Sequence, residues 1–165
     1  MNIVPATTAP TNRTSRLSHV EINVSDYARS IRFYDTVLRP LGWERWVCTH
    51  DCTSYCDGML KIILSPTEEK YQSGGFHRKR VGLNHLALSA RSKAEVDEFY
   101  RTVLKANGIP TLYAEGPTGS EEYYAVYFED PDRMKIEVVF APKYCDQAAW
   151  PNNIPSNFDP NQENV

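Results

Sequence analysis

The sequence predicts an α+β fold made of two βαβββ modules in tandem. Each half of the chain begins with a short stretch in which apolar and polar residues alternate, as they do along a half-buried strand. A segment with apolar residues at helical spacing follows, and then come three more strand-like stretches. The order repeats over the 66 residues that separate His19 from His85, a length that favours two halves of one fold over a solenoid.

Length and composition fit one domain with a substantial core, since the chain has 165 residues. A net charge of −3 gives no basis for binding nucleic acid or an anionic membrane, and we expect neither partner. No apolar run approaches the length of a membrane span, and residues 1–16 lack the apolar core of a signal peptide. Four cysteines without a secretory signal favour reduced thiols and a cytoplasmic location.

The first module is predicted to open with a strand at 17–24, whose polar face carries His19 and Glu21. Asp26 can cap the helix that follows, and Gly42 stops it. Three strands are then predicted at 43–50, 53–57 and 59–65.

The second module repeats this order after a polar linker, with its first strand at 83–90. Ser92 and Glu95 have the spacing of a capping box, and Gly108 ends the helix. Three strands are predicted at 111–114, 123–129 and 133–141. The predicted segments are therefore a flexible N-terminal tail (1–15), module 1 (16–65), the linker (66–80), module 2 (81–142) and a C-terminal tail (143–165).

Two histidines and one carboxylate hold matching positions in the modules. His19 and His85 share one slot on the polar face of the first strands. Aligning the last strands puts Ile63 opposite Glu137, a carboxylate in mid-strand that needs a partner. Pseudo-twofold symmetry would bring the two histidines and Glu137 to one point. Two imidazoles and a carboxylate around open positions suit iron(II) and tolerate other divalent metals, so we predict one ion (Fe, Mn, Ni or Zn) per chain. The alternative is two buried, hydrogen-bonded histidines and a glutamate in an ion pair.

Several stretches also carry a family resemblance. They are Leu-Ser-His19-Val-Glu-Ile-Asn-Val, Ser30-Ile-Arg-Phe-Tyr-Asp-Thr-Val-Leu38 with Leu41-Gly42-Trp43, Leu-Asn-His85-Leu-Ala-Leu, and Phe128-Glu-Asp-Pro-Asp132 leading to Glu137. On these residues the chain resembles the vicinal oxygen chelate superfamily, which includes glyoxalase I, extradiol dioxygenases, fosfomycin-resistance transferases and bleomycin-resistance binding proteins.

The resemblance covers residues 16–142 and implies a single domain. Its two modules would form a cup-shaped mixed sheet around a central cavity for metal and substrate, with helices outside. It also implies a small-molecule substrate and a homodimer. Two departures stand out. Arg133-Met134 replaces the usual Gly-Asn of the turn, and Ile63 removes the fourth ligand typical of glyoxalase I. The remaining triad matches the dioxygenase and fosfomycin-transferase pattern, so glyoxalase I itself is not expected.

Glu21 follows His19 by two residues on the same face, about 6.5–7 Å further along the strand. A carboxylate at that distance can act as general base on a metal-bound substrate. The alternatives are a salt bridge to an arginine such as Arg45 and simple exposure at the cavity rim.

Two other groups of residues are candidate sites. Cys48, Cys52 and Cys56, with His50 between them, raise the alternative of zinc, but a spacing of four does not match the close pairs of structural zinc sites. The tyrosines near 123–127 either line a cavity or fill the core, and the pattern does not assign their faces.

Two classes of function follow. The first is a metal-dependent small-molecule enzyme that chelates its substrate through paired oxygens, of dioxygenase, isomerase/lyase or epoxide-opening type. The second is a metal-free small-molecule binding or sequestering protein of the bleomycin-resistance type. The intact triad of His19, His85 and Glu137 favours the enzyme.

Overall fold

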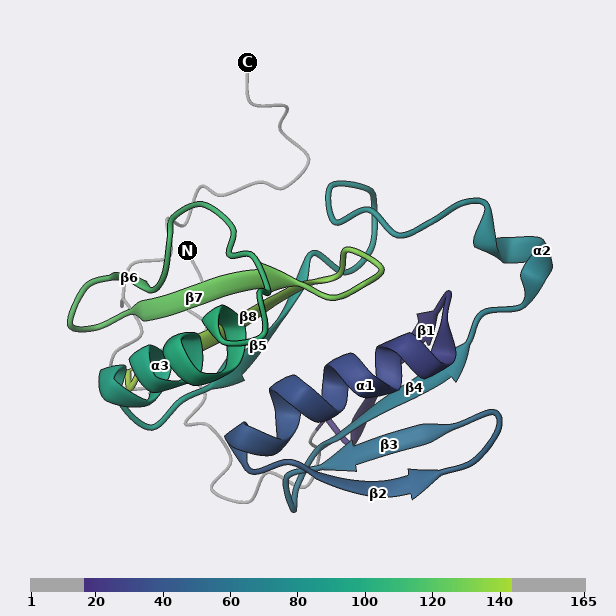
Figure 1. The fold of residues 1–165 in the computed structure, drawn as a ribbon, viewed down its shortest axis with the longest axis horizontal. Coiled ribbons are helices and arrows are strands. Elements are labelled where there is room, and N and C mark those ends of the chain that lie inside the picture. The colour runs from purple at the N-terminus through teal and green to yellow at the C-terminus, as the bar shows by residue number, and fades with distance from the viewer. Residues whose placement is uncertain (1–16, 144–165) are drawn as a thin grey trace, which may run out of the picture. The chain divides into compact units, whose positions relative to one another are not determined.

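The computed structural model describes residues 17–143, which divide between Gly75 and Phe76 into two compact units, called unit 1 (17–75) and unit 2 (76–143) (Figure 1). Each unit contains one four-stranded mixed sheet with a helix, so the fold is α+β with the predicted repeat. The predicted tails, 1–15 and 143–165, lie outside the described residues except at position 143.

In unit 1 the strand order is β1-β4-β3-β2, and α1 covers one face of the sheet (Figure 1). Strands β1 and β4 are parallel, and the other neighbouring strands are antiparallel. A short helix, α2, lies in the stretch predicted as linker. The elements are β1 (His19–Val24), α1 (Tyr27–Leu38), a 3₁₀ turn (Arg39–Leu41), β2 (Glu44–Cys48), β3 (Thr53–Cys56), β4 (Lys61–Pro66) and α2 (Glu69–Gln72).

Helix α1 begins and ends at the predicted signals. The side chain of Asp26 accepts a hydrogen bond from the Arg29 amide at 2.9 Å, which is N-cap geometry. Gly42 follows the 3₁₀ turn with a φ of 85°, a backbone conformation that favours glycine. The helix buries Tyr34 and Val37. The buried apolar residues of the sheet are Ile22, Val24, Tyr55, Ile62 and Leu64.

In unit 2 the strand order is β5-β8-β7-β6, and α3 packs on β7 and β8 (Figure 1). Strands β5 and β8 are parallel, as β1 and β4 are in unit 1. The elements are β5 (His85–Ser89), α3 (Lys93–Phe99), a π-helical continuation (Tyr100–Lys105), β6 (Thr118–Gly119), β7 (Tyr124–Glu129) and β8 (Lys135–Phe140).

Two local predictions in unit 2 need correction. The strand predicted at 111–114 is wrong, because Tyr113 takes a φ of 71° and the segment forms an isolated bridge, Thr111 with Phe128, in place of a strand. The fourth strand is instead the two-residue β6. The capping box is incomplete: Ser92 accepts from the Glu95 amide, but the Glu95 carboxylate reaches the amide of Arg91 rather than that of Ser92.

The two sheets share one register between their parallel strands. Both first strands begin at the histidine, two residues later than predicted, and the partner strands begin at a lysine directly opposite. This confirms the alignment that makes Ile63 the counterpart of Glu137. The matching pairs are His19 with Lys61 and His85 with Lys135, then Glu21 with Ile63 and Ala87 with Glu137.

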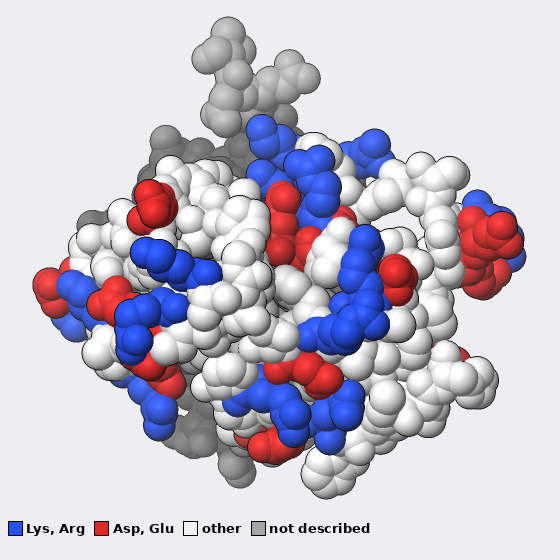
Figure 2. All heavy atoms as spheres, in the orientation of Figure 1, with Lys and Arg blue, Asp and Glu red and all other residues white. Residues whose placement is uncertain are grey.

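Charges of both signs are interspersed on the face shown in Figure 2, in line with the small net charge. Within residues 17–143 no helix is both long enough and apolar enough to cross a membrane.

Candidate functional site

Glu137 is a fully buried carboxylate in the middle of β8. Strand β8 lies between β5 and β7, so both of its edges are paired. Alternation along the strand turns Ile136 and Val138 toward one face and Glu137 toward the other. A buried carboxylate needs compensating partners, and the neighbouring strands supply them.

His85 is the first of these partners. The register puts Ala87 directly opposite Glu137, and His85 lies two residues earlier on the same face. Its Nε2 is 3.1 Å from Oε2 of Glu137. Two ligand atoms bound at right angles to one divalent ion at about 2.1 Å lie about 3 Å apart. The observed separation therefore fits two ligands of a single ion.

Tyr123 is the second partner. Its phenolic hydroxyl donates to Oε1 of Glu137 at 2.5 Å. Oε2 is buried, and no described residue makes an aligned hydrogen bond to it, since the close approach of His85 lacks hydrogen-bond geometry. An unsatisfied buried carboxylate oxygen is costly, and a cation beside it would remove that cost.

Asn84 fixes the orientation of the His85 ring. Its Oδ1 lies 2.8 Å from Nδ1 of His85, and its Nδ2 donates to the carbonyl of Arg78 at 3.2 Å. Because the amide oxygen faces the ring, Nδ1 carries the hydrogen. In neutral His85 the lone pair of Nε2 then faces the Glu137 carboxylate, and that arrangement requires either a proton or a metal cation between the two atoms.

His19 belongs to unit 1 and opens β1 there as an exposed side chain, not a buried one. The residue before it, Ser18, places its Oγ 3.3 Å from Nδ1 of His19, just as Asn84 approaches Nδ1 of His85. Taken singly, neither unit has among its described residues a group of three or more His, Cys, Asp or Glu side chains that could hold a metal. Unit 2 brings together His85 and Glu137, two of the three predicted ligands.

Glu21 lies opposite Ile63 on the polar face of unit 1, two residues from His19. It is exposed, and its Oε1 accepts a hydrogen bond from Ser65 Oγ at 2.6 Å. The salt bridge to Arg45 is wrong, because Arg45 pairs with Asp35 at 3.0 Å.

Two tyrosines on the Glu137 face escaped the sequence-based site. Tyr127 lies directly opposite Glu137 in the β7–β8 ladder. Burial raises the pKa of both the Tyr123 and the Tyr127 phenol, and hydrogen bonding to Glu137 raises both further. Their even spacing of four residues was the available signal, because residues four apart in a strand share a face.

The three cysteines in and between β2 and β3 are free thiols. Cys48 is exposed in β2, and the Thr53 hydroxyl lies 3.4 Å from its sulfur. Cys52 and Cys56 are half-buried.

Comparison with known proteins identifies the family to which the chain is similar. Residues 16–138 match the family model of the Glyoxalase/Bleomycin resistance protein/Dioxygenase superfamily. The uncharacterised YqjT protein of Bacillus subtilis strain 168 is 36% identical over 125 residues, which are 74% of this chain and 97% of YqjT.

Solved structures give the same fold. A candidate glyoxalase from Bacillus halodurans is 42% identical with a TM-score of 0.69, over 77% of this chain and 96% of that one. A lactoylglutathione lyase from Agrobacterium tumefaciens is 22% identical with a TM-score of 0.57, over 78% of this chain and 96% of that one. At that identity the likeness concerns the fold alone.

Proposed function

The chain belongs to the Glyoxalase/Bleomycin resistance protein/Dioxygenase superfamily, and we propose that it is a metal-dependent enzyme that binds a small molecule through two of its oxygens. The observation that carries the proposal is the buried, unsatisfied Oε2 of Glu137 beside the Nε2 lone pair of His85. In a neutral site these two atoms need a cation between them.

The proposed ligands are His19, His85 and Glu137, holding one divalent ion per chain, of iron, manganese, nickel or zinc. Two imidazoles and one carboxylate suit any of these ions. A divalent ion in this position supplies Lewis acidity, stabilising negative charge on substrate oxygens. Ile63 replaces the carboxylate in unit 1 and offers no fourth ligand, which leaves room for two oxygens of a substrate.

The chain's own side chains prepare the site for that role. Asn84 holds the tautomer of His85 that leaves Nε2 free to bind. Tyr123 holds the Glu137 carboxylate through Oε1 and leaves Oε2 available.

We further propose Glu21 as the general base. It lies one substrate's width from His19 along β1, and exposure gives it access to a bound small molecule. Ser65 donates to its Oε1, so Oε2 is the atom that accepts the proton. A proton removed beside two chelated oxygens fits isomerase, lyase, epoxide-opening and dioxygenase chemistry alike.

A second candidate function rests on the same pair of residues. If His85 is protonated, the imidazolium and Glu137 satisfy each other without a metal, as a metal-free binding or sequestering protein would require. Metal affinity therefore separates the two candidates.

The test is zinc affinity measured by competition with a chromophoric chelator. His85→Ala should weaken zinc binding at least about 100-fold, because one of the three ligands is lost. His50→Ala is the matched control, since the His50 side chain is exposed and lies 3.8 Å from the Asp51 carboxylate, and this variant should bind zinc like the parent. Equal affinity in His85→Ala and the parent would refute the metal enzyme.

We also propose a cytoplasmic homodimer, because superfamily members of this size often dimerise. Light scattering at tens of micromolar protein should give twice the chain mass. A monomer mass would refute the dimer.

A further inference from the structure

Lys135 is a cation buried on the same face of unit 2 as the proposed metal ligands. It lies directly opposite His85 in the β5–β8 register and two residues before Glu137 on β8. The residue is only 8% exposed. Its Nζ lies 5.6 Å from the ring centroid of Tyr127 and 5.7 Å from that of Tyr113.

Lys135 has no carboxylate of its own among the described residues of unit 2. Glu129 lies opposite it on β7, but the Glu129 carboxylate binds Arg78 through Oε1 and lies 3.5 Å from Arg133 through Oε2. The other nearby carboxylate, Glu137, is engaged by Tyr123 and His85. The aromatic rings stabilise the ammonium group but supply no counter-charge.

The Glu129 carboxylate is thus shared by two arginines, and Lys135 makes no ion pair with the described residues of unit 2. A divalent ion bound by His85 and Glu137 would add positive charge beside it. An ammonium group that lacks an ion-pair partner can bind an anion through a charge-assisted hydrogen bond.

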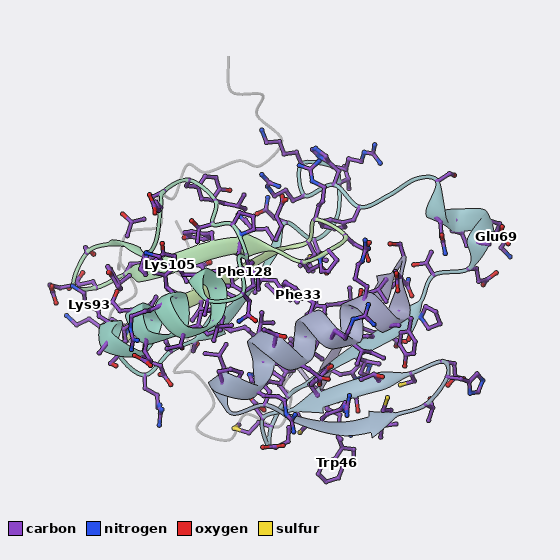
Figure 3. The ribbon with its side chains drawn as sticks, in the orientation of Figure 1. Phe33, Trp46, Glu69, Lys93, Lys105 and Phe128 are labelled. Carbon is purple, nitrogen blue, oxygen red and sulfur yellow. The ribbon has the colours of Figure 1, made fainter. Side chains whose placement is uncertain are left out.

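Unit 1 offers a comparison at the equivalent position. Lys61 lies opposite His19, with its Nζ 5.7 Å from the ring centroid of Trp46. Trp46 projects from β2 on the side away from α1 and is 69% exposed (Figure 3). Lys61 is itself only half-buried. The Lys61 side chain is therefore more open to solvent than that of Lys135, and solvent weakens an ionic contact there.

We propose that Lys135 binds a carboxylate or similar oxyanion group of the substrate, so that the substrate is an organic anion. The rings of Tyr113 and Tyr127, whose centroids are 5.3 Å apart in an edge-to-face arrangement, form the apolar walls of this subsite. The inference deepens the proposed function by adding a charged group to a substrate whose other oxygens chelate the metal.

The first experiment uses metal-free protein and two flat probes, benzoate and its neutral counterpart benzamide, with binding measured by calorimetry. The parent should bind benzoate about tenfold more tightly than benzamide, the worth of one charge-assisted contact. Lys135→Met should abolish the preference, and Lys135→Arg, which keeps the charge, should retain it. Lys61→Met is the matched control and should leave it unchanged. No preference in the parent, or a preference that survives Lys135→Met, would overturn the anion subsite.

The second experiment places the subsite next to the metal. Protein reconstituted with manganese is titrated with catechol, which offers paired oxygens, and with 3,4-dihydroxybenzoate, which adds a carboxylate. Tighter binding of 3,4-dihydroxybenzoate, lost in Lys135→Met while catechol affinity stays, supports both proposals. The two proposals can also fail separately. If metal-free protein prefers benzoate but the reconstituted protein does not bind catechol, the anion subsite stands and the proposed function is overturned.

Discussion

Tyr123 donates its phenolic hydrogen to Oε1 of Glu137 at 2.5 Å, and Glu137 is fully buried. The hydrogen bond joins the residue just before β7 to the middle of β8. It satisfies one oxygen of a carboxylate whose other oxygen has no aligned partner among the described residues.

Tyr123→Phe should therefore destabilise the metal-free protein by about 1–3 kcal/mol, because a buried charged acceptor loses its donor. Tyr124→Phe is the matched control. The Tyr124 hydroxyl donates to Asp97, which is exposed, so water can replace the lost donor. Tyr124→Phe should therefore lower the unfolding free energy by about 0.5 kcal/mol or less. Urea unfolding of both variants measures the difference, and equal losses would contradict the role given to Tyr123.

The same contact predicts a fall in stability at alkaline pH. Burial and Glu137 raise the pKa values of Tyr123 and Tyr127 in the folded protein. Below the ordinary tyrosine pKa of about 10, the folded and unfolded proteins both keep the phenolic protons. Above that pH the unfolded chain loses protons that the folded protein retains, so stability falls as pH rises.

Unfolding free energies of the parent and Tyr123→Phe between pH 9 and about 11.5 provide the check. The parent should lose stability more steeply with pH than the variant. Parallel curves would show that the Tyr123 phenol titrates normally in the folded protein.

Asn84→Ala should weaken metal binding about 10–100-fold, since the ring of His85 loses the acceptor that sets its tautomer. Asn107→Ala removes a similar amide, one that donates to the Val103 carbonyl at 2.8 Å, and should leave metal affinity unchanged. Chelator competition measures both variants. An Asn84→Ala protein with parental affinity would remove Asn84 from the site.

Glu21→Gln should slow turnover by about 10²–10⁴-fold while metal binding stays at the parent level, because the glutamine cannot accept a proton. Glu137→Gln should instead weaken metal binding. Steady-state kinetics together with metal analysis separates the two effects. If Glu21→Gln turns over at the parent rate, Glu21 is not the general base and lies only at the rim of the cavity.

The sequence predicted the parts of the site that the repeat makes visible. His19 and His85 fall on one slot because both modules begin with the same strand pattern. The register then confirms that Ile63 is the counterpart of Glu137. These inferences needed only alternation along strands and one internal comparison.

The partners of Glu137 were harder to predict because they depend on register between strands far apart in the chain. Aromatic residues occupy both faces of 123–128, with Tyr123 and Tyr127 toward Glu137 and Phe128 packed against Phe99. Composition alone could not separate those faces. The strand predicted at 111–114 failed for a local reason, the positive φ of Tyr113.

The proposal that one ion joins His19, His85 and Glu137 is tested most directly by titrating Mn²⁺ into histidine-labelled protein and following the ring signals by NMR. The chain has four histidines. The ring signals of His19 and His85 should broaden together, and the broadening should be complete at one equivalent of Mn²⁺. Those of His50 and His77 should stay sharp. Broadening of His85 without His19, or of none of the four, would contradict the proposed metal site.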